Sequence, residues 1–342
     1  MDILLIGIGL VVFALFHHVL PRAYEGELRV VERPSARPDI IAVLDEGAGT
    51  LQGGDGGGDL PQVTPGPGNS APAAGEAQPA ETDLPMPTPN PADWRAKFAD
   101  RFTSQVIRDD MSYSSADIAI DVTEYDERGV VYYVADIYVA SIDNLRTGLA
   151  GNKLGKGIRD TTYNIAKGND AILAISGDYY GTRAKGVVIR NGQVYRTSKY
   201  RDVCVLYYDG TMATYTADEF DPEQAIANGA YQAWSFGPML LRDGKAMANF
   251  SANDVNPSNP RSAIGYYEPG HYCFVVVDGR SKESNGFTLI QLSKLFERLG
   301  CAAAYNLDGG ETAAMVFDRR VYNEPAGGGR QVSDIVYIGE LK

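Results

Sequence analysis

A dense group of polar residues follows an apolar run near the C-terminal end of the sequence. The segment Asn306-Leu307-Asp308-Gly309-Gly310-Glu311-Thr312 contains an amide, two carboxylates, a hydroxyl and two glycines. Glycine lets the backbone approach a ligand closely, so neighbouring polar side chains can reach the same ligand. We therefore expect a functional loop here. Its catalytic candidates are Asp308 and Glu311, and its substrate-binding candidates are Asn306, Gly309, Gly310 and Thr312.

Two further loops have the same character, and each follows an apolar run. Asp278-Gly279-Arg280 leads into a loop before a helix, and Ser176-Gly177-Asp178 follows the apolar run Ala171–Ile175. Other Asp-Gly pairs, such as Asp209-Gly210 and Asp243-Gly244, lie between strand-like runs and predict ordinary hairpin turns. We expect the loop at Asp278-Gly279-Arg280 and the loop at Ser176-Gly177-Asp178 to be functional. They add Asp278 as a catalytic candidate and Ser176, Asp178 and Arg280 as substrate-binding candidates.

Histidine is nearly absent from the part of the chain that contains these loops. Of three histidines, His17 and His18 lie in an apolar N-terminal run, and His271 begins a strand-like run. This inventory disfavours a Ser-His-Asp triad, a Cys-His pair or a histidine-rich zinc site. Two carboxylates acting as acid and base or nucleophile suit glycosyl transfer. Arginine and backbone N–H groups suit a phosphate.

The elements that position these loops are clearest in the last third of the sequence. Tyr272–Val277 is strand-like, and Thr288 with Gln291 forms a capping box for a helix that runs to Leu299. Ala302–Asn306 is a short apolar strand. The order strand, helix, strand predicts a βαβ unit, with parallel strands if the two are neighbours.

That topology predicts where the three loops meet. Parallel strands end at one edge of a sheet, and ligands in open α/β sheets commonly bind beyond that edge. We therefore expect Asp278 and Asp308 to converge, and Asp178 to join them if its strand runs parallel in the same sheet. Hairpin patterns dominate elsewhere, so we predict an α+β (mixed α/β) fold. It has a mixed sheet with several β-hairpins, at least one βαβ unit and a single domain over residues 90–342.

The N-terminal residues differ in composition from this domain. Ile3–Leu20 is apolar apart from two histidines, which predicts a transmembrane signal anchor over residues 1–22. Residues 38–94 contain no Lys or Arg, nine acidic residues and abundant Gly and Pro. Such a composition cannot bury enough apolar surface to fold, so residues 23–89 are predicted to form a flexible acidic linker. Arginines after the apolar run favour a cytoplasmic domain, but long domains translocate largely regardless of charge. We expect an extracytoplasmic domain on the cell membrane.

Charge and cysteine content narrow the possible partners. The formal net charge is −13, and residues 38–94 account for nine of these charges, which leaves about −4 for the remainder. No basic patch with interleaved aromatic residues is present, so nucleic-acid binding is not expected. Cys204, Cys273 and Cys301 lie in or beside apolar runs and are expected to be small buried hydrophobes. The sequence also allows one disulfide between two of these cysteines and does not assign the pair.

Four motifs that occur in order resemble the phosphodiester glycosidase family. They are Asn259-Pro260-Arg261-Ser262-Ala263-Ile264-Gly265, Val275-Val276-Val277-Asp278-Gly279-Arg280, Gly286-Phe287-Thr288-Leu289 and Asn306-Leu307-Asp308-Gly309-Gly310. The resemblance covers about residues 110–342 and is strongest from residue 170. It implies that Arg261 and Arg330 bind substrate. Glu311 stands where the family has a glycine, which adds a carboxylate to the loop.

These observations favour a membrane-anchored, extracytoplasmic glycosidase without a cofactor, acting on a sugar phosphodiester or a cell-envelope glycan such as an exopolysaccharide. A non-catalytic glycan-binding module on a tether is the alternative. A third hypothesis is a divalent-cation site for calcium, because carboxylate oxygens suit that ion. Its expected ligands are Asp178, Asp278, Asp308 and Glu311.

Overall fold

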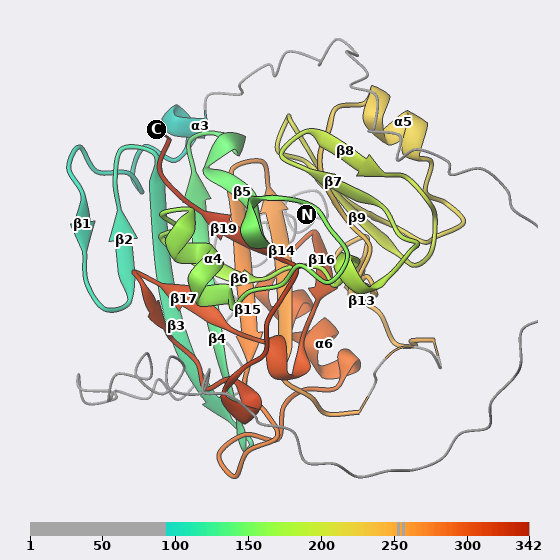
Figure 1. Cartoon of the computed structure of the whole chain (residues 1–342). Coiled ribbons are helices and arrows are strands. Elements are labelled where there is room, and N and C mark those ends of the chain that lie inside the picture. The colour runs from blue at the N-terminus through green and yellow to red at the C-terminus, as the bar shows by residue number, and fades with distance from the viewer. Residues whose placement is uncertain (1–93, 252–253, 255–256, 342) are drawn as a thin grey trace, which may run out of the picture.

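A computed structural model describes residues 94–251, 254 and 257–341 (Figure 1). The predicted signal anchor at 1–22 and the predicted linker at 23–89 lie outside these residues. Within the described part of the chain, no helix has both the length and the apolar character needed to cross a bilayer. The first described element is the short helix α3 (Trp94–Lys97), whose Trp94 is buried.

A seven-stranded sheet forms the centre of the fold and has the order β1-β2-β3-β4-β15-β14-β16. Its long strands are rich in β-branched and aromatic residues, which favour the extended conformation. β15 is buried along almost its whole length because both faces of the sheet are covered. The strands are β1 (Ile107–Arg108), β2 (Ser112–Ser114), β3 (Ile118–Glu127), β4 (Val130–Val139), β14 (Arg261–Glu268), β15 (His271–Val277) and β16 (Ala303–Leu307).

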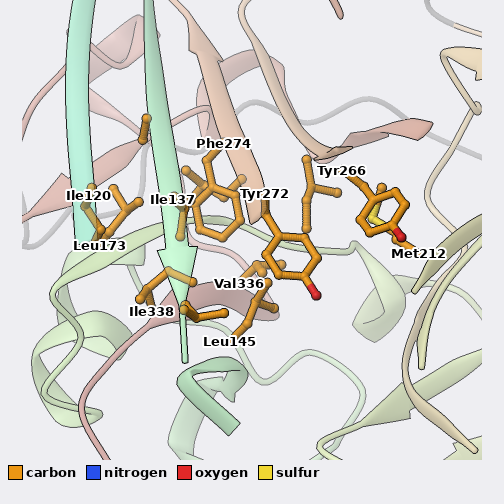
Figure 2. Close-up of a cluster of buried hydrophobic side chains, with 14 of the residues drawn as sticks. Ile120, Ile137, Leu145, Leu173, Met212, Tyr266, Tyr272, Phe274, Val336 and Ile338 are labelled. Atoms are coloured by element: carbon orange, nitrogen blue, oxygen red, sulfur yellow. The ribbon is translucent and has the colours of Figure 1, made fainter. Parts of the chain in front are cut away.

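A second sheet, of order β18-β17-β6-β19-β5, packs on one face of the central sheet. Figure 2 shows Ile137 and Phe274 of the central sheet against Leu173 and Ile338 of the second. The helix α4 (Thr162–Gly168) covers the other face of the second sheet. The strands are β5 (Leu145–Leu149), β6 (Leu173–Ser176), β17 (Met315–Phe317), β18 (Arg320–Val321) and β19 (Asp334–Ile338).

The helix α6 (Leu289–Leu299) covers the opposite face of the central sheet. Its capping box at Thr288 and Gln291 forms as predicted, and Gly300 ends it in the left-handed conformation with φ of 82°. Beside it lies a two-stranded ribbon of β12 (Leu241–Arg242) and β13 (Lys245–Ala246).

A third sheet, of order β10-β9-β11-β7-β8, lies to one side of the central sheet (Figure 1). Its hairpins turn at the predicted sites, because Asn191 and Gly192 both have positive φ, at 50° and 80°. Its elements are β7 (Val188–Arg190), β8 (Gln193–Arg196), β9 (Val203–Tyr207), β10 (Met212–Tyr215), the helix α5 (Pro222–Ala227) and β11 (Ala230–Trp234). Short 3₁₀ helices are η2 (Ile142–Asn144), η3 (Ala150–Asn152), η4 (Tyr180–Thr182), η5 (Gly310–Thr312) and η6 (Ala326–Gly328).

The predicted α+β class is confirmed, but the two strands of the βαβ unit, β15 and β16, are not neighbours in the sheet. β14 lies between β15 and β16 and pairs antiparallel with both. The tight β14–β15 hairpin makes β14 the partner of β15, so α6 carries the chain past it to the far side of β14. β15 and β16 still run in the same direction because both oppose β14, and they end at the same edge. β6 belongs to the second sheet, so the condition under which Asp178 would join the other two aspartates, a parallel strand in the same sheet, is not met.

The three cysteines are buried and unbonded, as expected for small hydrophobes. The sulfur atoms of Cys273 and Cys301 lie 3.7 Å apart, beside the backbone of Gly265. A Cβ atom on Gly265 would lie 2.6 Å from the sulfur of Cys273, so the glycine makes room for both.

Candidate active site

The ends of β15 and β16 place Asp278 and Asp308 at one edge of the central sheet. Val277 and Leu307 are the last residues of these strands, and they pair with Arg261 and Ser262 at the start of β14. With adjacent strands about 4.8 Å apart, the backbones of the two aspartates emerge roughly 10 Å from each other. The predicted convergence of these two loops is therefore confirmed, although the position of β14 between their strands was not predicted.

The loop after β6 reaches the same edge from the second sheet. The Asp308 amide donates to the Gly177 carbonyl at 2.9 Å, and the Ser176 hydroxyl donates to the Asp308 carbonyl at 2.7 Å. Ser262 of β14 donates to the Ser176 carbonyl at 3.3 Å. Ser176 is fully buried and holds the backbone of the Asp308 loop in this arrangement. Its predicted contact with substrate stays a prediction.

The glycines of the Asp308 loop allow it to lie directly on the start of β14. A Cβ atom on Gly309 would lie 2.7 Å from the Pro260 carbonyl oxygen, which is shorter than the usual distance between a Cβ atom and a neighbouring heavy atom. Gly310 donates its amide to the same carbonyl at 2.9 Å and has φ of 66°. The two glycines therefore permit a close backbone approach that larger residues would prevent.

Asp308 has a buried carboxyl group with a raised pKa. Its side chain is only 4% exposed, and Oδ2 has no hydrogen-bond partner among the described residues. Burial raises the pKa of Asp308 to about 7, although the nearby charge of Arg330 and the hydroxyl of Thr312 oppose this rise. A carboxyl of this kind is partly protonated at neutral pH and is suited to proton transfer.

Asp278 has a contrasting environment, because several donors surround its carboxylate. Oδ1 accepts from the side-chain amide of Asn323 at 2.8 Å, and the Glu324 amide donates to both oxygens at 3.1 and 3.2 Å. The Ser284 hydroxyl donates to the Asp278 carbonyl at 2.6 Å. Asn323 also binds the backbone of Ala313 and so ties Asp278 to the Asp308 loop. Sequence reasoning missed Asn323, because a single Asn in a turn carries no signal of a distant partner.

Two arginines near the two carboxyl groups, Arg280 and Arg261, make different contacts. Arg280 donates from Nε and Nη2 to the side-chain oxygen of Asn259, at 3.2 and 2.7 Å, which fixes the guanidinium. A Cβ atom on Gly310 would lie 3.4 Å from its Nη2, so the guanidinium lies against the Asp308 loop. Arg261 is buried and donates to the carbonyls of Phe287 and Pro257, so it holds loop backbone together. Burial lowers the pKa of Arg261 to about 10.

Arg330 and Glu311 form the exposed rim of the loop. Nη1 of Arg330 lies 4.0 Å from Oε2 of Glu311, and both side chains are almost half exposed. The guanidinium of Arg330 also lies over the ring of Tyr179 at 5.7 Å. Arg330 thus supplies a positive charge near Asp308, and its predicted contact with substrate stays a prediction. The catalytic role of Glu311 stays a prediction.

Asn306 and Thr312 make contacts within the protein. The Asn306 side-chain amide donates to the Gly237 carbonyl at 2.9 Å, and Oδ1 is buried without a partner among the described residues. The Thr312 hydroxyl donates to the Gly309 carbonyl at 2.7 Å and shapes the turn of η5. Their predicted substrate contacts also stay predictions.

Asp178 lies behind the edge in a fully buried cluster of charges. Its carboxylate pairs with Arg183 and lies 3.6 Å from Nη2 of Arg190. Nε of Arg190 donates to Asp334 at 2.7 Å, and Asp334 accepts from the Asp178 amide at 2.6 Å. Burial raises the pKa of Asp334 to about 6. Asp178 is occupied by these arginines, so its predicted role in substrate binding stays a prediction with no contact in its favour.

The calcium hypothesis is not supported by this geometry. Across residues 94–251, 254 and 257–341, no group of three or more His, Cys, Asp or Glu side chains is arranged to hold a metal ion. Arginines surround Asp178, and Glu311 lies at the exposed rim. The expected ligands therefore do not form one carboxylate cluster.

Comparison with known proteins identifies the class to which this fold and edge belong. Residues 169–339, half of the chain, match the phosphodiester glycosidase family. The chain therefore belongs to the phosphodiester glycosidase family, as the sequence motifs predicted.

The chain is also similar to the SPbeta prophage-derived uncharacterized protein YomE of Bacillus subtilis (strain 168). The two are 31% identical over 179 residues, which are 50% of this chain and 28% of that protein. The chain therefore spans less than a third of the length of this relative.

Two solved structures share the fold. The catalytic domain of zebrafish N-acetylglucosamine-1-phosphodiester alpha-N-acetylglucosaminidase, auto-inhibited by its pro-peptide, has a TM-score of 0.54 and 20% identity. The match covers 66% of this chain and 83% of that one. A hypothetical protein from Synechocystis has a TM-score of 0.51 and 14% identity, over 66% of this chain and 62% of that one.

The charge cluster behind the edge makes a prediction about stability. Asp178→Asn leaves the partly buried Arg183 without its carboxylate, whereas Arg190 keeps Asp334, and we expect unfolding to become easier by about 3 kcal/mol. Urea denaturation at pH 7 measures the change. The matched control is Asp318→Asn, which breaks an exposed ion pair with Arg108 and should change the unfolding free energy by less than about 1 kcal/mol. Equal losses in the two variants would contradict a stabilising role for the cluster.

The raised pKa of Asp308 predicts a pH-dependent stability difference. A folded-state pKa of about 7, against 3.8 for the ordinary group, gives stability that is fully present below 3.8 and lost as pH rises through 7. Asp308→Asn never ionises, so its stability relative to the unchanged protein should increase with pH. The upper limit is about 4 kcal/mol, at about 1.4 kcal/mol for each pKa unit. Denaturation at pH 4, 6 and 8 measures the difference, and a difference independent of pH would contradict the shift.

Proposed function

We propose that this domain is a glycosidase that hydrolyses the bond between a sugar and the phosphate of a phosphodiester. The observation that carries the proposal is the buried, unpartnered carboxyl of Asp308, at the same sheet edge as Asp278 and close to Arg280 and Arg330. Membership of the phosphodiester glycosidase family supports it. The name of the zebrafish enzyme that shares the fold supports the same substrate class.

Asp308 acts in this proposal as the proton donor. The protonated carboxyl gives its proton to the bridging oxygen while the bond between that oxygen and the anomeric carbon breaks, so the phosphate leaves as a monoester. A neutral carboxyl suits this substrate because an ionised one would repel the diester anion. The bound anion would itself oppose ionisation of Asp308, so the substrate helps to keep the proton in place.

Asp278 acts as the second carboxylate. Asn323 and the Glu324 amide donate to it, which fixes its orientation. It either attacks the anomeric carbon directly or takes a proton from the attacking water. The first route retains and the second inverts the anomeric configuration, so NMR of the first-formed sugar distinguishes them.

Arg280 and Arg330 hold the phosphate in this proposal. Asn259 fixes the plane of Arg280, whose guanidinium lies against Gly310, and a planar guanidinium can bind two phosphate oxygens at once. Arg330 lies at the exposed rim and supplies a second positive charge. Glu311 is placed to orient Arg330 in this arrangement.

We also propose that the domain works outside the cytoplasm on a membrane anchor. The apolar run Ile3–Leu20 and the acidic residues after it support this location. An alkaline phosphatase fused after Lys342 should be active in cells, because that reporter requires the extracytoplasmic space. The same fusion without residues 1–22 should be inactive. Activity only in the shortened fusion would contradict the proposal.

Substitution of Asp308 provides the test of activity. Asp308→Asn keeps the size of the side chain but cannot donate an acidic proton, so we expect kcat/KM to fall by about 10²–10⁴. The substrate is the aryl diester of an N-acetylglucosamine 1-phosphate, and ³¹P NMR follows its conversion to the aryl monoester. In the unchanged enzyme, kcat/KM should fall as pH rises through about 7, where free Asp308 loses its proton.

The control for that experiment is Asp209→Asn. Asp209 also precedes a glycine, but its carboxylate only caps the β9–β10 turn by accepting from the Thr211 amide. This variant should keep full activity. Full turnover by folded Asp308→Asn would remove Asp308 from the mechanism. Tight sugar binding by the unchanged protein with no monoester after long incubation would favour the glycan-binding module instead.

A further inference from the structure

A cleft of about 640 Å³ opens between the third sheet and the segment that precedes β12. One wall is formed by the segment between β8 and β9, and another by residues that follow β13. Both walls carry aromatic and planar polar side chains. Those used below are Tyr200, Arg201, Asp202, Asn249, Phe250 and Asp254.

Two sets of contacts connect this cleft to the Asp308 loop. Gly237 and Pro238 line the cleft, and their carbonyls accept from the side chain and backbone amide of Asn306, two residues before Asp308. The guanidinium of Arg183 lies 5.7 Å from the ring of Tyr200, which lines the cleft. The charge of Arg183 also acts on the Asp308 carboxyl. The cleft is therefore connected to the Asp308 loop through Asn306 and Arg183.

We propose that this cleft binds neutral sugar units of a glycan next to the phosphodiester, so that the preferred substrate is an oligosaccharide rather than a single sugar. The proposal rests on the proposed glycosidase function. It deepens that function by naming the class of substrate, because nothing in the hydrolysis itself requires a second sugar-binding region.

The lining favours a sugar over other ligands. Tyr200 and Phe250 both line the cleft, and neither is fully buried: Tyr200 is 46% exposed and Phe250 is half-buried. Both rings can therefore offer an apolar face to a pyranose ring. Asp202, Asn249 and Asp254 supply acceptors for the hydroxyl groups around such a ring. A drug-like apolar ligand would find too little apolar surface here.

The charges of the cleft favour a neutral glycan. Two aspartates and one arginine leave one net negative charge, and Arg201 lies 3.9 Å from Asp254, which already neutralises much of its charge. An anionic glycan would meet a lining of net negative charge, in which Arg201 already faces Asp254. The phosphate of the substrate belongs instead with Arg280 and Arg330, outside the cleft.

Direct binding tests the cleft without relying on catalysis. Isothermal titration of the full chain with neutral tetrasaccharides of β-1,4-linked N-acetylglucosamine and of α- and β-1,4-linked glucose should give binding to at least one. Tyr200→Ala should weaken it about 3- to 10-fold, the loss expected for one aromatic face. Tyr195→Ala is the matched control, because Tyr195 is similarly exposed, at 38%, but lies outside the cleft lining. It should bind as the unchanged protein does.

Kinetics with two substrate lengths tests the connection to Asp308. The ratio of kcat/KM for a tetrasaccharide aryl phosphodiester to that for the monosaccharide diester should exceed one, fall in Tyr200→Ala and stay unchanged in Tyr195→Ala. Absence of hydrolysis with intact, Tyr200-dependent binding would overturn the proposed function but not the cleft. Hydrolysis with no chain-length preference, or binding that is equal in both tyrosine variants, would overturn the inference. Preferential binding of a sulfated or uronic-acid tetrasaccharide would overturn its assignment to neutral sugars.

Discussion

The hydrogen bond from the Asp308 amide to the Gly177 carbonyl is the contact on which the proposed site depends. It joins the loop after β6, in the second sheet, to the loop after β16, in the central sheet. The close packing leaves Asp308 only 4% exposed, and loss of water around the carboxyl is the main cause of its raised pKa. Packing of backbone against backbone at this edge thus sets the chemistry of one side chain. Gly309 and Pro260 repeat the same principle on the β14 side, where no Cβ atom would fit.

The charge cluster of Asp178, Arg183, Arg190 and Asp334 lies next to this contact and stabilises the loop after β6. Asp178 follows β6, Arg190 ends β7 and Asp334 begins β19, so the cluster connects the second and third sheets beneath the Asp308 loop. A buried ion pair adds little stability over a well-packed apolar core, but an incomplete one is strongly destabilising. The cluster therefore favours one relative placement of the two sheets, since sliding one over the other would leave charges unpaired. Asp178, whose sequence context predicted a substrate-binding residue, thus takes part in the contacts that hold the two sheets together.

Local sequence determined what could be predicted. Positive φ at Asn191 and Gly192 and the capping box at Thr288 are decided by neighbouring residues, so the hairpin and α6 were found with bounds close to those observed. The partner of a strand is decided by distant packing. Nothing in the residues before Asp178 distinguishes a strand of the second sheet from one of the central sheet. The same reason hid Asn323, which reaches Asp278 across 45 residues. The convergence of the Asp278 and Asp308 loops could be predicted because the local order of strand, helix and strand sets the common direction of β15 and β16.

The two carboxyl groups show how one sheet edge can create two different environments from the same residue type. The Asp278 carboxylate accepts hydrogen bonds from the Asn323 side chain and the Glu324 backbone amide. Oδ2 of Asp308, in contrast, is buried with no hydrogen-bond partner among the described residues. Glycosidases commonly need such a pair, because one carboxyl group must give a proton while the other remains an acceptor. An anionic substrate adds a further requirement, since its charge must be neutralised without ionising the donor. In the proposed mechanism Arg280, which lies against Gly310, and Arg330, at the exposed rim, supply that neutralisation on groups distinct from the donor. The proposed mechanism therefore assigns anion binding and proton donation to different side chains, so a buried Asp308 with a raised pKa is compatible with arginines at the same edge.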